Sequence, residues 1–221
     1  MNVAIIVAAR MDSKRLPGKA LLPFHGVPMI VFLLRRLRSS RRATDIVLAT
    51  TSRPQDDVLE KWAEREGIAV FRGAENDLVA RYAAAAEQFA ADYVVRVTGD
   101  CPFVDGALVD ECLEQSLKYT PFDLATTKGC FPVGLDCEIY PARVMVALNR
   151  RRDLTPEHRE HLTLHLYEHS DDFKILRLRP PLSLSGVNAT FTVDTMDDYH
   201  RAMILLKSHT LENTCMEEIN S

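Results

Sequence analysis

The chain lacks the features that place a protein in a membrane or an oxidising compartment. Among its 221 residues the longest apolar run after the start, 27–34, is far too short to span a bilayer. The start has no basic leader followed by a small-residue cleavage site, so we expect no signal peptide. The five cysteines are an odd set without C-x-x-C spacing, which argues against a disulfide framework and a zinc site. We predict a cytoplasmic protein without membrane contact.

The glycine-rich phosphate-binding motifs are absent as well. Neither G-x-x-x-x-G-K-[ST] nor G-x-G-x-x-G occurs, so the phosphate modes in which glycines cradle the ligand are disfavoured. Charge, however, is uneven: residues 1–42 carry nine Lys or Arg and one acid, whereas the remainder carries eighteen and thirty. The basic amino-terminal part indicates an anionic ligand, and the acidic remainder argues against nucleic acid as a partner.

Strand and helix patterns alternate through the first half of the chain. Apolar strands are predicted at 3–9, 45–50, 68–71 and 93–97, with helices at 28–40, 54–66 and 76–90 between them. Repeated β-α-β units predict an α/β fold with a doubly wound, mostly parallel sheet and right-handed crossovers.

After residue 120 the pattern becomes that of an α+β insertion. It predicts strands at 123–127, 134–140, 173–178 and 190–193, a helix ending at 149, and a helix over 155–169. A last helix is predicted after Thr195, which forms a capping box with Asp198. No long linker or internal repeat is visible, so we expect residues 1–221 to form a single domain.

The first strand leads into a strongly basic loop. Residues 10–19 (RMDSKRLPGK) contain two Arg, two Lys and a Pro-Gly turn. The segment beyond the carboxyl end of a central parallel strand is where open α/β sheets bind ligands. Forked guanidinium and compact ammonium groups both suit phosphate oxygens, so the loop predicts a polyanion site. The alternative is a solvated surface loop.

Two acids follow strands at the same predicted edge. Asp100 lies in the segment 98–102 (TGDCP) after the strand at 93–97, and Asp194 follows the strand at 190–193. Hard carboxylate oxygens beside phosphates suit Mg²⁺, which takes one or two carboxylates. The alternatives are a turn or cap carboxylate for Asp100 and a helix-dipole contact for Asp194. Cys101 is not predicted to be a nucleophile, because the neighbouring negative charge disfavours its thiolate.

Two further patterns are ambiguous. Asp136 and Glu138 alternate along the predicted strand at 134–140 and share one face, where they are candidates to hold acceptor hydroxyls or simply to be solvated. Histidines recur at 158, 161, 165 and 169 with helical spacing. Because the general base of an H-E-x-x-H motif is missing, we expect an interface or solvated face rather than a zinc site.

Several spaced motifs together resemble the spore coat polysaccharide biosynthesis protein F family. They are 8–23 (AARMDSKRLPGKALLP), 71–73 (FRG), 96–102 (RVTGDCP), 132–138 (PVGLDCE), 159–163 (REHLT) and 194–195 (DT). That family is similar to the cytidylyltransferases that activate 3-deoxy-manno-octulosonate and sialic acids. The resemblance covers nearly the whole chain and implies a fold of the nucleotide-diphospho-sugar transferase type.

The resemblance also implies roles for individual residues. The residues implied to bind the nucleotide are Ala8, Ala9, Arg10, Arg15 and Lys19 at the triphosphate and Arg72, Asp77 and Arg81 near the base and ribose. The residues implied to bind Mg²⁺ are Asp100 and Asp194. The residues implied to face the acceptor are Asp136 and Glu138. Arg10, Lys19 and Asp100 would be catalytic. Residues 1–120 would form a nucleotide-binding half, 121–190 an acceptor or dimer portion, and 191–221 a closing strand and helix. A homodimer is implied.

The predicted reaction is Mg²⁺-dependent nucleotidyl transfer. An acceptor oxygen attacks the α-phosphorus of CTP, pyrophosphate leaves, and a CMP-activated sugar or sugar acid is released for bacterial surface polysaccharide or glycan synthesis. Orientation of the reactants and electrostatic stabilisation of the phosphate oxygens would supply most of the catalysis. The alternatives are nucleotidyl transfer to a sugar 1-phosphate, glycosyl transfer from a nucleotide sugar, and a non-catalytic nucleotide-binding or scaffold protein.

Overall fold

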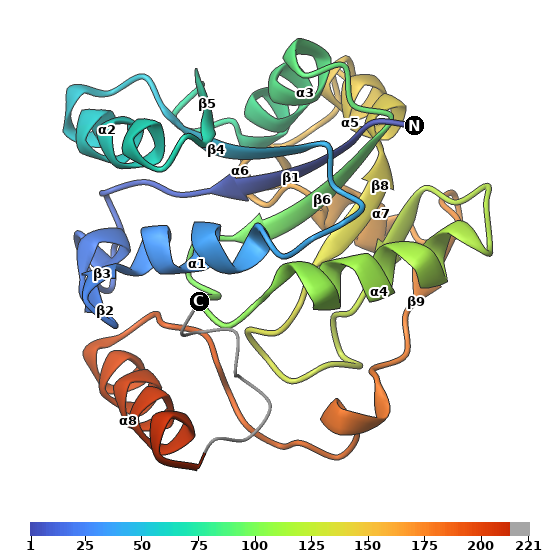
Figure 1. Ribbon diagram of the computed structural model, residues 1–221. Helices are drawn as coiled ribbons and strands as arrows, with labels where there is room; N and C mark the ends of the chain where they lie inside the picture. The colour runs from blue at the N-terminus through green and yellow to red at the C-terminus, as the bar shows by residue number, and fades with distance from the viewer. Residues whose placement is uncertain (213–221) are drawn as a thin grey trace.

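A seven-stranded sheet forms the centre of the molecule (Figure 1). The computed structural model describes residues 1–212, with side chains to residue 207. The strands of the sheet are β1 (Val3–Ala8), β4 (Asp45–Thr51), β5 (Ala69–Gly73), β6 (Tyr93–Thr98), β7 (Leu124–Thr126), β8 (Glu138–Pro141) and β9 (Ile175–Arg177). The short strands β2 (Pro23–Phe24) and β3 (Val27–Pro28) pair separately as a hairpin.

The strand order reverses direction between β1 and β6. The order is β5-β4-β1-β6-β8-β7-β9, and β8 alone runs antiparallel to its neighbours. The chain winds outward from β1 through β4 to β5 and then returns to add β6 on the other side of β1. Such a reversal is the topological switch point at which open α/β sheets bind ligands. The predicted mostly parallel α/β sheet is confirmed.

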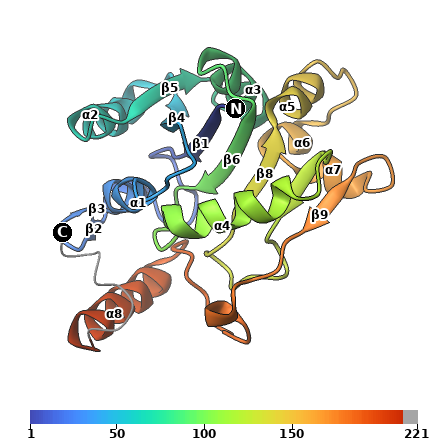
Figure 2. The ribbon, with the colours of Figure 1, turned by 45° about the vertical axis from the view of Figure 1, so that its right-hand side comes forward.

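Helices cover both faces of the sheet (Figure 2). They are α1 (Met29–Leu37), α2 (Asp57–Arg65), α3 (Leu78–Gln88), α4 (Gly106–Leu117), α5 (Ala142–Asn149), α6 (Pro156–Glu160), α7 (Leu164–Glu168) and α8 (Met196–Glu212), with 3-10 turns η1 (Lys19–Leu21), η2 (Pro54–Asp56) and η3 (Leu182–Leu184). Apolar side chains of α1, α2 and α4 pack on one face and those of α3, α5 and α7 on the other. Burial on both faces explains why β1 is apolar without alternation. None of the helices within residues 1–212 has the length and apolar character needed to cross a membrane.

The last helix packs on a third apolar cluster beside the β2–β3 hairpin (Figure 1). The Thr195 N–H donates to Asp198 Oδ2 at 2.8 Å, and the Asp198 N–H donates to Thr195 Oγ1 at 3.3 Å. The predicted capping box is therefore confirmed, and it sets the start of α8 at Met196, two residues after Asp194. Cys215 lies outside the described residues.

The single helix predicted over 155–169 is wrong. The chain forms α6 and α7, separated by residues 161–163. Thr155 starts α6 with a capping box, whereas His161 leaves helical geometry at φ −106° and ψ 82°. The Thr163 hydroxyl donates to the buried carboxylate of Glu138 at 2.9 Å. This tertiary contact accompanies a break that the apolar periodicity does not reveal.

Two predicted strands are shorter than expected. Residues 134–137 are not in a strand, because Gly134 has φ +89° and its N–H donates to Asp136 Oδ1 at 2.7 Å in a tight turn. Asp136 and Glu138 therefore do not share one strand face as predicted. At 190–193 the predicted strand is reduced to an isolated bridge between Val133 and Thr190, and the Val193 N–H donates to the Asp100 carbonyl at 2.8 Å.

Candidate active site

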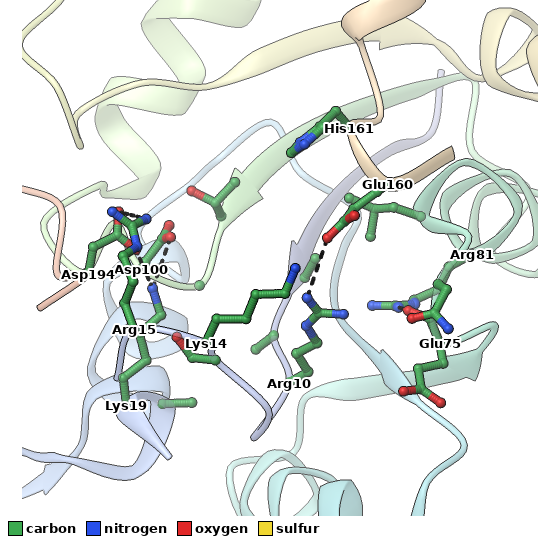
Figure 3. Close-up of a pocket in the computed structure, with 18 of the residues that line it drawn as sticks. Arg10, Lys14, Arg15, Lys19, Glu75, Arg81, Asp100, Glu160, His161 and Asp194 are labelled. Atoms are coloured by element: carbon green, nitrogen blue, oxygen red, sulfur yellow. Dashed lines mark hydrogen bonds and ion pairs between the residues drawn. The ribbon is translucent and has the colours of Figure 1, made fainter. Parts of the chain in front are cut away.

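A cleft opens at the carboxyl ends of β1 and β6. It has a volume of about 350 Å³. Its predicted members are Ala8, Ala9, Arg10, Arg15, Lys19, Arg81, Asp100 and Asp194 (Figure 3). Gly99 lets the two strand ends approach, since a Cβ there would lie 2.9 Å from the Ala8 carbonyl oxygen. The switch point of the sheet thus carries most of the residues that the sequence singles out.

The basic loop is held by its own backbone. Gly18, at φ +74°, donates its N–H to the Met11 carbonyl at 2.9 Å and closes the loop. The Met11 N–H donates to the buried Asp56 carboxylate at 2.8 Å. Glycine is needed at the turn because a left-handed conformation strains other residues. The side chains of Arg10, Lys14 and Arg15 therefore project from a defined frame into the cleft.

Lys19 joins the two predicted metal-binding acids. Its ammonium lies 3.1 Å from Asp100 Oδ2 and 2.8 Å from Asp194 Oδ1, and it donates to the Val193 carbonyl at 3.0 Å. Arg15 adds an ion pair to the other oxygen of Asp194 at 2.8 Å. Burial opposes ionisation of Asp100, but the Lys19 charge and hydrogen bonds from Thr98 and Lys19 outweigh it, so its pKa lies below the ordinary value. Two carboxylates thus converge on one cationic position.

Arg81 and Arg10 line the side of the cleft nearest α3 (Figure 3). Arg81 is 3% exposed and donates to the Ala74 carbonyl at 2.7 and 2.9 Å and to the Glu75 carbonyl at 2.9 Å. It therefore holds the backbone of the loop before α3. Arg10 lies 3.7 Å from the Glu160 carboxylate, which approaches from α6.

Four of the predicted site residues lie outside the cleft lining. Arg72 pairs with Asp57 and Glu60, each at 2.7 Å. Asp77 caps α3 by accepting the Ala80 N–H at 2.7 Å. The remaining two are Asp136 and Glu138. Burial raises the pKa of Asp136.

Glu138 lies in a buried polar cluster behind the cleft. The cluster consists of Glu138, Arg96, Lys128, Thr163 and Tyr167. Burial opposes ionisation of Glu138, but Arg96 and Lys128, with hydrogen bonds from Tyr167 and Lys128, lower its pKa to about 2. A buried carboxylate of this kind is stabilised only while its cations and donors stay in place.

The depressed pKa of Glu138 predicts a loss of stability in acid. Its contribution to the free energy of unfolding is complete above the ordinary carboxyl value of 4.5 and disappears as pH falls toward about 2. We expect the stability difference between the wild type and Glu138→Gln to shrink over that interval. Urea unfolding followed by fluorescence of the single tryptophan, Trp62, at pH 7, 4.5, 3 and 2 measures it. A difference independent of pH would contradict the ionised state of Glu138.

The cleft also contains residues to which the sequence reasoning assigned no role there. They include Glu75, Asn76, Arg96, Glu160 and His161. The sequence does indicate that Arg96 is unusual, because Arg96 is a charged residue inside the otherwise apolar strand β6. The position of His161 depends on the break between α6 and α7: His161 lines the cleft, whereas His158, His165 and His169 pack together, with ring centroids 4.1–6.5 Å apart.

Cys101, beside Asp100, is a buried thiol. Burial, together with the charge of Asp100, raises its pKa well above the ordinary value. This agrees with the prediction that its thiolate is disfavoured.

Comparison with known proteins identifies the family. A cytidylyltransferase family model matches residues 4–218. The chain is 31% identical over 206 residues to the spore coat polysaccharide biosynthesis protein SpsF of Bacillus subtilis, covering 90% of this chain and 83% of that one. It is 35% identical over 153 residues to the 3-deoxy-manno-octulosonate cytidylyltransferase of Chlorobium chlorochromatii, covering 68% and 60%.

A solved structure shares the fold over almost the whole chain. The structure of a cytidylyltransferase from Leptospira borgpetersenii superposes with a TM-score of 0.88 at 33% identity, covering 94% of this chain and 87% of that one. The sheet is of the nucleotide-diphospho-sugar transferase type, as the resemblance implied. The range that the family model matches, 4–218, includes every residue that lines this cleft. The chain therefore belongs to the cytidylyltransferase family and is a nucleotidyltransferase.

Proposed function

We propose that this enzyme transfers CMP from CTP to a sugar or sugar acid, with release of pyrophosphate, in the synthesis of a bacterial surface polysaccharide or glycan. The observation that carries the proposal is the meeting of Lys19, Asp100 and Asp194 beside the basic loop at the β1–β6 crevice. Relatives named for spore coat polysaccharide synthesis and for 3-deoxy-manno-octulosonate cytidylyl transfer support it.

The residues at this position suit a divalent cation. Asp100 Oδ2, Asp194 Oδ1 and the Val193 carbonyl already surround one cationic nitrogen with hard oxygen atoms. Within residues 1–212 no group of three or more His, Cys, Asp or Glu side chains could hold a metal ion. We propose that Asp100 and Asp194, two hard carboxylates on one side of the cleft, hold Mg²⁺ together with phosphate oxygens and water, as this ion prefers. When bound, Mg²⁺ would neutralise phosphate charge.

The basic loop would bind the triphosphate. Arg10, Arg15 and Lys19 present three cations at the end of β1, beside the backbone of Ala8 and Ala9. Charge-assisted hydrogen bonds from these groups would orient CTP and stabilise the leaving pyrophosphate, with Arg10 and Lys19 as the catalytic cations.

The base and ribose would bind on the α3 side of the cleft. There Arg81 would act by holding the 74–76 backbone, while Arg72 and Asp77 would support the same side from outside the lining. The acceptor would lie toward β8, near Asp136 and in front of Glu138.

We further propose that residues 1–221 act as one domain and assemble as a homodimer in the cytoplasm. The four cysteines within residues 1–212 are free, which suits a reducing compartment. Sedimentation velocity at micromolar concentration tests the dimer, and a monomer of 24.9 kDa at every concentration would contradict it.

A pyrophosphate-release assay tests the proposed reaction. Each of the four ribonucleoside triphosphates is combined with a panel of sugar acids, sugars and sugar 1-phosphates, with Mg²⁺ or with EDTA. We expect release with CTP and a sugar or sugar acid, its loss in EDTA, and its return when Mg²⁺ is added in excess. Turnover with another triphosphate would change the nucleotide assignment. No release with any pair would overturn the transfer reaction.

A further inference from the structure

Arg96 is a charged residue built into the floor of the cleft. It lies on β6 directly opposite Glu138 on β8, and its side chain is 14% exposed. It lines the cleft together with Thr98, two residues further along the same strand face. Its Nη1 donates to Glu138, and its buried Nε has no hydrogen-bond partner among the described residues. An arginine in this position is costly to bury and has donor capacity left over.

Glu138 has no corresponding capacity to bind a ligand. Its side chain is 3% exposed and receives hydrogen bonds from Thr163 at 2.9 and 3.0 Å and from Tyr167 at 2.6 Å, in addition to Arg96. Lys128 lies 3.0 Å from one of its oxygens. A carboxylate has about four acceptor positions, and these partners use them. The physical role open to Glu138 is to hold the Arg96 guanidinium in one orientation.

The place of Arg96 in the cleft suits the acceptor rather than the triphosphate. The triphosphate cations come from the loop after β1, and the two acids stand at one side of the cleft (Figure 3). Arg96 instead belongs to the β6–β8 side of the cleft, whose lining also includes Glu160 at the end of α6 and His161 in the α6–α7 break. The hydroxyl of Thr163 in that break bonds to Glu138, so the same cluster ties this segment to the floor beneath it.

We propose that Arg96 is the residue that selects a carboxylate-bearing acceptor, and that Glu138 is a positioning residue acting through it. This inference rests on the proposed function and names the residue that recognises the acceptor. A planar guanidinium fixed through Nη1 keeps its remaining Nη donors, on a side chain that lines the cleft, for one further anion, and a carboxylate matches their spacing. Inside the cleft this contact discriminates strongly against a neutral analogue, which offers the remaining guanidinium donors no anionic partner.

The first test compares an acid acceptor with its neutral analogue. The probes are 3-deoxy-manno-octulosonate and its carboxamide, with CTP and Mg²⁺, and the measured quantity is kcat/KM for each. We expect the wild type to prefer the acid about a hundredfold, and Arg96→Gln to reduce the preference to about threefold. Arg96→Lys retains the positive charge but lacks the forked donors of the guanidinium, so its preference for the acid should lie between those of the wild type and Arg96→Gln. The KM for CTP should change less than twofold in every variant.

Two further variants keep the test valid if Arg96→Gln fails to fold. Arg96→Gln leaves Glu138 buried without its main cation, whereas the double variant Arg96→Gln/Glu138→Gln removes both charges. Glu138→Gln alone should raise the acceptor KM about tenfold, because the Arg96 guanidinium is then held less firmly in its orientation. Arg36→Gln is the matched control, because Arg36 is 13% exposed and pairs with Asp105 outside the cleft lining. It should preserve both the acid preference and the CTP affinity.

A binding measurement separates failure of this inference from failure of the proposed function. The Nε–H signal of Arg96 in ¹⁵N-arginine-labelled protein, assigned by its absence in Arg96→Lys, should shift when 3-deoxy-manno-octulosonate is added in the presence of CTP. Addition of the carboxamide under the same conditions should leave the Nε–H signal unshifted. Retention of the acid preference in Arg96→Gln, a parallel rise in the CTP KM, or an unmoved Nε–H signal would each overturn the inference. Absence of turnover with a shifted signal would instead overturn only the proposed reaction.

Discussion

Asp100→Asn is expected to lower the rate of pyrophosphate release roughly a thousandfold. The carboxamide matches the carboxylate in shape but brings no negative charge to a divalent ion, and Asp100 is one of the two acids of the described chain that hydrogen-bond to Lys19. The unfolding midpoint should move by no more than about 3 °C, because the side chain is near the surface of the cleft and Lys19 keeps its contact with Asp194. Steady-state kinetics and thermal unfolding measure the two quantities.

Asp110→Asn provides the control for this substitution. Asp110 is also a hydrogen-bonded carboxylate, accepting from the Arg41 N–H at 2.7 Å, but it lies on α4 outside the cleft lining. It should retain nearly the full rate. An Asp100→Asn enzyme that keeps more than a tenth of the wild-type rate would contradict the proposed metal role.

Gly134→Ala is expected to destabilise the protein by about 3 kcal/mol. A Cβ at Gly134 would lie 2.3 Å from the backbone nitrogen of Thr192, and the residue has φ +89°. The clash is with backbone, so a side-chain rotation cannot relieve it. Because Thr192 precedes Asp194 by two residues, the folded fraction should also lose activity. Urea unfolding followed by Trp62 fluorescence, with activity per folded molecule, measures both effects.

Gly186→Ala separates the steric clash from the backbone strain. Gly186 also has a positive φ, +78°, but a Cβ there would meet no atom within 4 Å. Its substitution should cost about 1 kcal/mol and leave activity unchanged. Equal losses in the two variants would show that strain alone, rather than the contact with Thr192, determines the effect at Gly134.

The elements that the sequence predicts well are those whose pattern is local. Strand β1 is apolar throughout because helices cover both faces of the sheet, and its predicted end at residue 9 differs from the observed Ala8 by one position. The cap of α8 and the turn at Gly18 likewise depend on neighbouring residues. For such features the chemistry of a few consecutive residues is sufficient.

The predictions that failed concern places where tertiary contacts overrule periodicity. Residues 155–169 have the spacing of one helix, yet the bond from Thr163 to Glu138, 25 positions earlier, accompanies a break. The left-handed Gly134 replaces the start of a predicted strand with a turn. Neither distant neighbour is visible in the local pattern: Glu138 lies outside the segment 155–169, and Thr192, whose backbone packs closely against Gly134, lies much further along the chain.

The sequence by itself determined the α/β fold, the basic loop and the acids that follow the strands, since parallel strands bring their carboxyl ends to one edge. Only the tertiary structure decided which of these side chains meet. Lys19 contacts acids 81 and 175 positions away, and Arg96 pairs with a carboxylate 42 positions away. Strand register and helix packing create those contacts, and they depend on distances that no local spacing specifies.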